Sequence, residues 1–420
     1  MTTLTDQPQA SDEAGDARGA IGTAIGDYVD RLRGGDVGGL PAVLGFIALM
    51  ILFSVLEPDK FATERNVANL LNQSALYIYI AMGLIFVLLL GEIDLSAGFA
   101  AGTGAAVLAV LATQKGLAWP LAMAGALVAG AVIGLAIGLL VARLGIPSFV
   151  VTLAWFLGLQ GVMLLVIGEG GTIRINDSTI LSLMNKNLSP LIGWLFFLLV
   201  IGGYAAVSLL TATRRRSAGL TSAPQAVMLA KIAALAVVLG VVVFLLNQER
   251  AVNPTIRSLK GVPLIVPITA VFVVVLTFVL NRTAFGRHIY AVGGNAEAAR
   301  RAGINVPGIR IMCFMICSVL AAFGGILYAS RDNSVSPSTG GAQTLLYCVA
   351  AAVIGGTSLF GGKGKIIDAV IGGLVVAVIG NGLPLITSQA GVQFIITGLV
   401  LLLAASVDAI SRRRAAATGR

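Results

Sequence analysis

Long apolar runs separated by short polar connections cover the chain from residue 39 to residue 411. A helix needs about 20 mostly apolar residues to cross a bilayer, and twelve runs approach that length. They lie near 39–56, 74–90, 97–113, 118–142, 149–168, 190–211, 226–246, 262–280, 311–329, 345–360, 366–385 and 392–410. The pattern predicts an all-α polytopic membrane protein with about twelve transmembrane helices, in which the Gly-rich runs 97–113 and 345–360 either span fully or are broken or re-entrant.

Composition supports this class and excludes several others. The 420-residue chain is 57% hydrophobic and 11% charged, whereas soluble domains contain about 25% charged residues. This excludes a soluble enzyme, a nucleic-acid-binding protein and a disordered scaffold. Three cysteines and one histidine give no basis for a disulfide framework or for a metal site.

The positions of the basic residues predict the orientation. If the N-terminus is cytoplasmic, eighteen of the 28 Lys and Arg residues fall on the cytoplasmic side, nine fall outside, and Lys231 lies within a span. Cytoplasmic connections carry an excess of Lys and Arg. We therefore expect both termini inside, with an acidic tail at 1–38, a transmembrane domain at 39–411 and a basic tail at 412–420.

The segment Gly91-Glu92-Ile93-Asp94-Leu95-Ser96-Ala97-Gly98 places two carboxylates between apolar runs with almost no connecting loop. Such carboxylates are costly within a membrane unless they pair, cap a helix or face water. One interpretation is structural, with Asp94 or Ser96 accepting the first amide hydrogens of the next helix. The other is a helix break that lines a translocation pathway.

A second polar tract lies at 281–310. Asn295 is a candidate N-cap, Glu297 falls in the first turn and Gly303 is a natural stop, so we expect a helix of about two turns between two Gly-containing turns. Arg300 and Arg301 alone fit the binding of anionic headgroups equally well, but headgroup binding does not require a capped helix.

These motifs resemble one family. Glu297-Ala298-Ala299 followed by Gly303 resembles the loop by which importer permeases of the ATP-binding cassette (ABC) class dock into an ATPase subunit. The string from Arg282 to Val306 resembles the same loop in the ribose/xylose-type sugar permease family. The segment Gly91–Gly98 resembles that family's Gly-Gly-Ile-Asp-Leu-Ser-Val-Gly element, with Glu92 where many members have Gly. The segment Ile354–Gly362 resembles a third block, and the similarity covers roughly residues 40–412.

Within this family, the chain is most similar to the xylose-permease branch. That branch carries an additional helix pair, and two further apolar runs occupy about 190–246 here. The resemblance thus implies a ten-helix ABC-importer core plus one extra pair, in agreement with the twelve runs counted independently.

The resemblance also implies the mechanism. Two permease copies would form a pathway in the bacterial inner membrane, a cytoplasmic ATPase would drive it, and a periplasmic binding protein would deliver a monosaccharide, such as xylose or a similar pentose. The residues that would form the coupling loop are Arg282, Phe285, Gly286, Arg287, Gly294, Asn295, Glu297, Ala298, Ala299 and Gly303. ATP with Mg²⁺ would be bound by the partner ATPase, because Gly362-Lys363-Gly364-Lys365 fits no Walker A spacing.

Polar residues near the remaining runs are candidates for the pathway. They are Glu92, Asp94, Ser96, Asn72, Gln73, Asn333 and Ser336, with Tyr77, Trp155 and Gln160 as further groups that suit a sugar. The connections 169–189 and 330–344 are expected outside, either to receive the binding protein or as solvated connectors. We do not expect a deep sugar pocket, because a binding protein supplies most of the affinity.

Two other classes of function remain as alternatives. An ion-coupled secondary transporter would use Glu92 and Asp94 to relay protons, although the spans carry few other charges. A membrane-embedded enzyme would need a metal-binding motif or a nucleophile with a base, and the single histidine, His288, lies in a basic connection. The sequence therefore predicts no catalytic residues.

Overall fold

The computed structural model describes residues 40–220, 225–251, 253–255 and 258–417. The predicted tail at 1–38 lies outside these residues. The predicted basic tail at 412–420 lies partly within them, since the last helix continues to Ala417.

Apolar helices account for each of the twelve predicted runs. Within the described residues, nine helices are long and apolar enough to cross a membrane. They are α4 (Glu64–Leu88), α5 (Ala97–Ala109) continued by the π-helical turn η1 (Val110–Gln114), α6 (Trp119–Ala142), α7 (Ser148–Ile167), α9 (Pro190–Ser217), α10 (Gln225–Leu246), α11 (Ile265–Arg282), α14 (Val306–Asp332) and α16 (Ile366–Ile386). Shorter apolar stretches occupy α2 (Leu40–Leu56), α15 (Gly341–Gly355) and the part Ala390–Val400 of α17 (Ala390–Ala417). The prediction of an all-α polytopic membrane protein is confirmed.

Several helix boundaries differ from the sequence expectation, those of α4 and α15 for a clear local reason. Helix α4 begins at Glu64 instead of residue 74, because the Thr63 side chain caps a polar first turn that hydropathy does not detect. Helix α15 ends at Gly355 instead of residue 360, where Gly356 has a φ of 119° that ends the helix. The Gly-rich run at 97–113 is a continuous helix that widens to a π-helical turn only at Val110.

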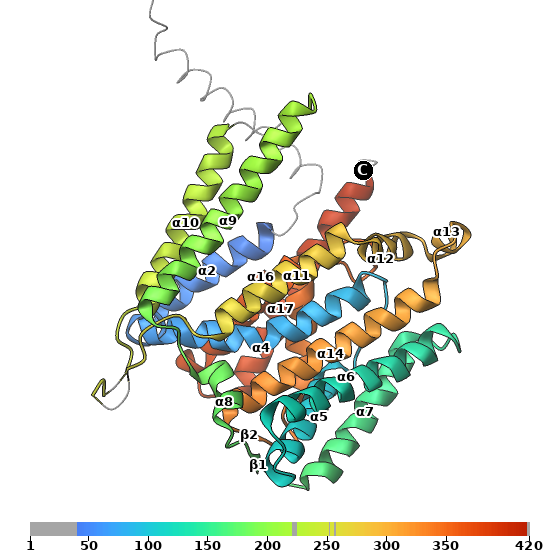
Figure 1. The fold of residues 1–420 in the computed structure, drawn as a ribbon, viewed down its shortest axis with the longest axis horizontal. Coiled ribbons are helices and arrows are strands. Elements are labelled where there is room, and N and C mark those ends of the chain that lie inside the picture. Colours follow the sequence, from blue (N-terminus) through green and yellow to red (C-terminus); the bar gives the residue numbers. More distant parts are fainter. Residues whose placement is uncertain (1–39, 221–224, 252, 256–257, 418–420) are drawn as a thin grey trace, which may run out of the picture.

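The short elements mark two opposite ends of the bundle. The connections at one end contain α12 (Ala284–Gly294) and α13 (Ala296–Arg301), and we call it the α13 end. The other end, the sheet end, contains β1 (Ile173–Arg174), β2 (Ser334–Val335) and α8 (Ser178–Asn185). Helix α14 runs from one end to the other (Figure 1). A further one-turn helix, α3 (Pro58–Phe61), precedes α4.

Helix α14 is the centre of the core and packs against α4, α5 and α6. Its contact with α6 depends on small residues. A Cβ atom at Gly130 would lie 2.7 Å from the Ser318 carbonyl oxygen, and one at Gly134 would lie 2.4 Å from the Phe314 carbonyl oxygen. Interfaces between membrane helices use such residues to let backbones approach closely. The many glycines of the sequence therefore serve, at these positions, to bring α6 against α14.

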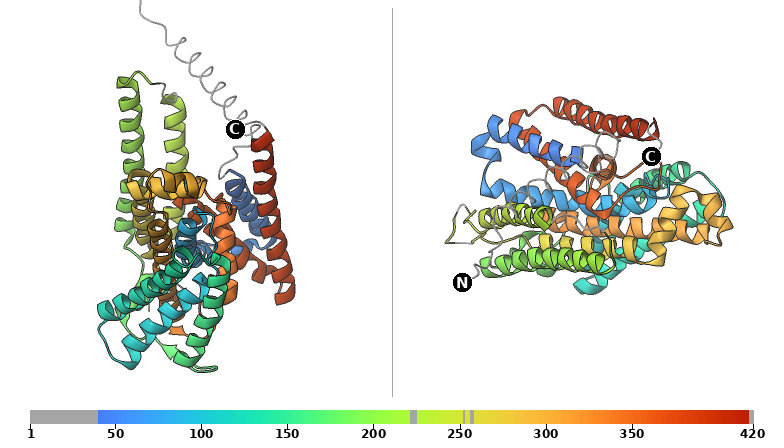
Figure 2. Two further views of the ribbon diagram at one scale, coloured as in Figure 1. Left: turned by 90° about the vertical axis from the view of Figure 1, so that its right-hand side faces the viewer. Right: turned by 90° about the horizontal axis from the view of Figure 1, so that it is seen from above.

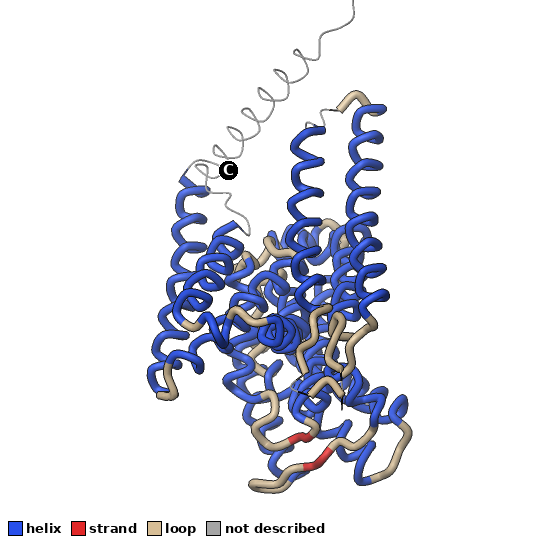
Figure 3. The backbone as a smooth tube through the Cα atoms, turned by 90° about the vertical axis from the view of Figure 1, so that its left-hand side faces the viewer, coloured by secondary structure: helices blue, strands red, loops and turns tan. Residues whose placement is uncertain are grey.

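Helices α9 and α10 stand apart from this core. They lie side by side and extend beyond the rest of the bundle (Figures 2 and 3), and most of their apolar side chains are exposed. Backbone hydrogen bonds hold the pair at the sheet end, where Leu188 N donates to Val262 O at 2.8 Å and Gly261 N donates to Leu246 O at 2.8 Å. These two helices occupy the segment predicted as the extra pair, 190–246.

The α6–α14 contact predicts that Gly134→Ala destabilises the protein. The added methyl group cannot fit 2.4 Å from the Phe314 carbonyl oxygen, and overpacking of this kind costs about 1–3 kcal/mol. Thermal unfolding of the purified protein in detergent measures the loss. Gly158→Ala on α7 is the matched control, because a Cβ at Gly158 meets no atom within 4 Å. Equal stability of the two variants would contradict the assigned role of Gly134.

Candidate functional site

The predicted short helix after Asn295 is present as α13. The Asn295 side chain accepts a hydrogen bond from Ala298 N at 2.9 Å, and Gly303 follows the helix with a φ of 84°. Both features agree with the expected cap and stop. Glu297 and Ala298 are exposed, whereas Ala299 is buried against the bundle. Helix α13 therefore presents one face to the outside of the molecule.

The expected glycine turn before this helix is wrong. Residues Gly293 and Gly294 form the end of α12, whose first turn is capped by the Thr283 side chain through a 3.2 Å bond from Gly286 N. Apolar residues at i, i+4 and i+7, namely Phe285, Ile289 and Val292, lie against the core. This amphipathic spacing was a readable signal for a helix. The loop is thus two helices joined at Asn295.

The remaining predicted coupling residues divide between the surface and the interior. Arg282, Arg287 and Gly294 are exposed, Phe285 is half-buried and Gly286 is buried. The Arg300 and Arg301 side chains form ion pairs with Glu297 on the same helix, the Arg301 pair at 3.2 Å. These pairs lie along the exposed surface of α13.

Three motifs that are distant in the sequence meet at the α13 end. The Leu89 carbonyl oxygen accepts a hydrogen bond from Gly362 N at 2.9 Å. A Cβ at Gly293 would lie 1.8 Å from the same oxygen, and one at Gly361 would lie 2.9 Å from Gly91 N. Only glycine permits such close approach. We call these contacts the glycine junction, which joins α12 to the connections that follow α4 and α15.

The two carboxylates of the 91–98 segment have separate structural partners. Glu92 forms an ion pair with Arg310 on α14, with 3.2 Å between Oε1 and Nε. Asp94 is fully buried, and its Oδ1 accepts hydrogen bonds from Ser96 N at 2.9 Å and from the Ser96 hydroxyl. Asp94 thus supports the start of α5, as the structural interpretation expects, whereas the Ser96 side chain makes no cap bond of its own.

The other candidates for the pathway lie elsewhere. Asn72 and Gln73 are half-buried on α4. Asn333 and Ser336 lie at the sheet end, where Asn333 Oδ1 accepts a bond from Asn185 at 3.3 Å and the Ser336 hydroxyl bonds that of Ser338 at 2.9 Å. The structure therefore does not bring the seven predicted residues into one site.

The two connections expected outside form a joint surface at the sheet end. Strands β1 and β2 pair antiparallel, with Ile173 opposite Val335. The Asn185 amide donates to Ser330 O at 2.8 Å, and the Ser330 hydroxyl donates to Leu181 O at 3.1 Å. Two segments predicted separately, 169–189 and 330–344, are thus one assembled cap.

Glu249 organises the connection between α10 and α11 at the same end. Its carboxylate accepts hydrogen bonds from Ala251 N at 3.0 Å, Leu259 N at 3.0 Å and the Ser258 hydroxyl at 2.7 Å. Donors of this kind favour the charged form, and they lower the pKa of Glu249 to about 2.

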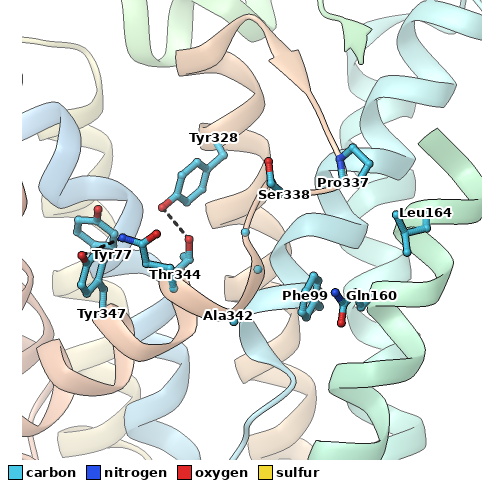
Figure 4. Close-up of a pocket in the computed structure, with 13 residues that line it drawn as sticks. Tyr77, Phe99, Gln160, Leu164, Tyr328, Pro337, Ser338, Ala342, Thr344 and Tyr347 are labelled. Carbon is cyan, nitrogen blue, oxygen red and sulfur yellow. Dashed lines mark hydrogen bonds between the residues drawn. The ribbon is translucent and has the colours of Figure 1, made fainter. Parts of the chain in front are cut away.

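A pocket of about 620 Å³ lies beside this cap. Figure 4 shows Tyr77 and Tyr347 on one side, Phe99, Gln160 and Leu164 on the other, and the segment with Ser338 and Ala342 between them. The described residues that line it are all uncharged; they are Tyr77, Phe99, Gln160, Leu164, Tyr328, Pro337, Ser338, Gly340, Gly341, Ala342, Gln343, Thr344 and Tyr347.

The sequence identified only part of this pocket. Tyr77 and Gln160 were candidates, but Trp155 packs against the core and does not line the pocket. Gln343, Thr344 and Tyr347 were missed, although their spacing of i, i+1 and i+4 places polar groups on one side of an apolar helix. Among the described residues, no group of three His, Cys, Asp or Glu side chains is placed to hold a metal ion.

Residues 66–405 match the family described as "Branched-chain amino acid transport system / permease component". The chain is 34% identical over 372 residues to the xylose transport system permease protein of Escherichia coli K12, covering 89% of this chain and 92% of the relative. The Haemophilus influenzae xylose transport system permease protein is 31% identical over 377 residues, covering 89% and 96%.

A third relative is named for another sugar. The ribose import permease protein of Escherichia coli K12 is 30% identical over 368 residues, covering 87% of this chain and 92% of the relative. No solved structure matches the chain. The family match, over residues 66–405, includes the three motifs of the glycine junction.

The Glu92–Arg310 pair predicts coupled stability effects. The Glu92 side chain is 14% exposed and the Arg310 side chain is 30% exposed. Removal of one partner therefore leaves the charge of the other partly desolvated. Glu92→Gln or Arg310→Gln should each lower the free energy of unfolding by about 1–2 kcal/mol, between the values for exposed and buried pairs. The double variant should lose less than the sum, as unfolding in detergent measures. Lys60→Gln, which breaks an exposed pair with Glu57, is the control, and additive losses would contradict the coupling.

The Glu249 hydrogen bonds predict a pH-dependent loop. The pKa is about 2 in the folded loop, below the ordinary value of 4.5. The stabilisation of the loop by the ionised Glu249 carboxylate is therefore complete above about pH 4.5 and is lost as the pH falls toward 2. Hydrogen exchange of the Ala251 and Leu259 amides, corrected for intrinsic rates, should become faster from pH 5 to pH 3. Glu249→Gln should abolish this change, and pH-independent protection in the native chain would refute the prediction.

Proposed function

Because this chain belongs to the family described as "Branched-chain amino acid transport system / permease component", we propose that it is the permease subunit of an ATP-driven ABC importer for a monosaccharide. Xylose or a similar pentose is the proposed substrate, since the relatives named above are xylose and ribose permeases. The chain would move sugar from a periplasmic binding protein to the cytoplasm across the bacterial inner membrane.

The observation that carries this proposal is the exposed helix α13 fixed on the glycine junction. Its outward residues Glu297 and Ala298 are exposed, while α12, which precedes it, approaches the Leu89 carbonyl oxygen through Gly293. Because α13 is exposed and α12 is held by backbone contacts, a displacement of α13 is passed on to the bundle and is not absorbed by flexible side chains. These properties suit a site that docks into an ATPase subunit. ATP and Mg²⁺ would be bound by that ATPase subunit.

The proposed topology places the α13 end in the cytoplasm. The basic residues Arg282, Arg287 and Arg310 lie at this end, and cytoplasmic connections are rich in arginine. Both termini are then cytoplasmic. The sheet end faces the periplasm, where the cap formed by 169–189 and 330–344 offers one continuous surface to the binding protein. A second copy of the chain completes the pathway in this scheme.

An ion-coupled transporter is the alternative considered from the sequence. Its proton relay would use Glu92 and Asp94. Glu92 is paired with Arg310 at 3.2 Å, and Asp94 holds the first turn of α5 through Ser96. Both carboxylates therefore have structural roles, which favours the ATP-driven importer.

Substitution of Ala298 tests the coupling surface. Ala298→Trp adds bulk to an exposed position of α13, so the permease should fold normally but bind its purified ATPase subunit at least tenfold more weakly. A tenfold loss corresponds to about 1.4 kcal/mol. Titration of the ATPase onto nanodisc-embedded permease measures the affinity.

Ala218→Trp is the matched control for this experiment. Ala218 is exposed in the turn after α9, on the same proposed side of the membrane, and it lies outside the coupling helices. Equal ATPase binding by both variants would overturn the assignment of α13. Sugar uptake that continues after ATP depletion but stops when the proton gradient is removed would overturn the proposal of an ATP-driven importer.

A further inference from the structure

The pocket at the sheet end has the chemistry of a sugar site. Its volume of about 620 Å³ lies within the range of small-molecule sites, which combine apolar walls with a few polar groups. We propose that this pocket is the permease's own monosaccharide-binding site, which receives the sugar before it enters the pathway. The inference rests on the proposed importer function and adds the residues that hold the substrate.

Aromatic rings lie on two opposite sides of the pocket (Figure 4). Tyr77 and Tyr347 meet edge to face with 5.6 Å between ring centroids. Phe99 is held in the same way against Phe156 at 4.7 Å. Such pairing fixes the rings in place. A pyranose has apolar C–H faces and a rim of hydroxyl groups, so rigid aromatic surfaces match its faces.

Polar groups placed between the rings match the hydroxyl rim. The Gln343 amide donates to the Tyr347 hydroxyl at 2.9 Å, and the hydroxyl groups of Tyr328 and Thr344 are 3.2 Å apart. Gln160 reaches the pocket from α7 (Figure 4). Amides and hydroxyls both donate and accept hydrogen bonds, which is the property that a sugar hydroxyl requires of its partner.

The lining also favours an uncharged ligand. A carboxylate or an ammonium group is costly to desolvate without a charged partner, and each of the described lining residues is neutral. A free amino acid carries both charges, so this pocket does not suit one, although the family description mentions branched-chain amino acids. The ligand that fits is a neutral polyol.

The loop that closes the pocket is fixed by backbone contacts. A Cβ at Gly98 would lie 2.4 Å from the Gly341 carbonyl oxygen, and one at Gly102 would lie 2.4 Å from the Thr339 carbonyl oxygen. Helix α5 therefore supports residues 339–341 directly. The same loop begins at β2, which pairs with β1 in the surface proposed for the binding protein. The pocket thus lies next to the proposed point of sugar delivery.

Three matched glutamine substitutions test the site. Gln160→Leu and Gln343→Leu remove exposed pocket amides, and Gln389→Leu removes an exposed amide in the connection between α16 and α17, outside the pocket. Ligand-observed saturation-transfer NMR with millimolar D-xylose reports binding to the permease alone in nanodiscs. We expect both pocket variants to give a xylose signal at least fivefold weaker than that of the wild type, and Gln389→Leu to give the wild-type signal. L-leucine should give no signal.

The outcomes separate this inference from the proposed function. Equal xylose signals from all three variants, a wild-type signal no stronger than that of L-leucine, or no wild-type xylose signal would overturn the pocket assignment, even if the complete transporter imports sugar. Conversely, failure of ATP-dependent uptake of every monosaccharide by the complete transporter would overturn the proposed function.

Tyr347→Phe keeps the ring against Tyr77 and removes only the hydroxyl. We expect this variant to change the ratio of the xylose signal to the ribose signal. An unchanged ratio would argue against a polar role for Tyr347.

Discussion

The contact on which the α13 end depends is the approach of Gly293 to the Leu89 carbonyl oxygen. No side chain separates these two backbones, because a Cβ at Gly293 would lie 1.8 Å from that oxygen. The same oxygen accepts the hydrogen bond of Gly362 N. Three connections are therefore locked together by main-chain atoms, which cannot change rotamer. A force applied to α13 reaches α4 and the segment before α16 without passing through flexible side chains.

Helix α14 extends this rigidity to the opposite end. It begins at Val306, a few residues after α13, and its 27 residues correspond to about 40 Å at 1.5 Å per residue. Arg310 near its start pairs with Glu92, while Tyr328 near its end bonds Thr344 in the pocket. The glycines of α6 that meet α14 through backbone atoms leave little space for bending. One helix thus connects the proposed coupling surface to the proposed sugar site.

The sequence predicted those features whose cause is local. Hydropathy located the twelve helices, and the Asn295 cap and Gly303 stop defined α13, because each depends on a few neighbouring residues. Contacts between distant segments were not predictable. The Glu92–Arg310 pair joins residues that lie 218 positions apart. The glycine junction combines three motifs, and their resemblance to a family did not predict that they are in contact. Tyr328 and Tyr347 look like ordinary membrane aromatics until the fold places them around one pocket.

The placement of the two sites constrains how transport can work. The Tyr328–Thr344 bond joins α14 to α15, and α15 continues into the glycine junction through residues 356–362. Helices α14 and α15 are therefore linked by side chains near the proposed sugar site, whereas at the α13 end the glycine junction joins the connection after α15 to α12 and to the connection after α4. Displacement of α13 acts on α14 through the short segment 302–305 and on α15 through the glycine junction. The side-chain link is one neutral hydrogen bond, which contributes about 1 kcal/mol, whereas the glycine junction adds close backbone packing to its hydrogen bond. The conformational change is therefore expected to open at the pocket while the glycine junction holds.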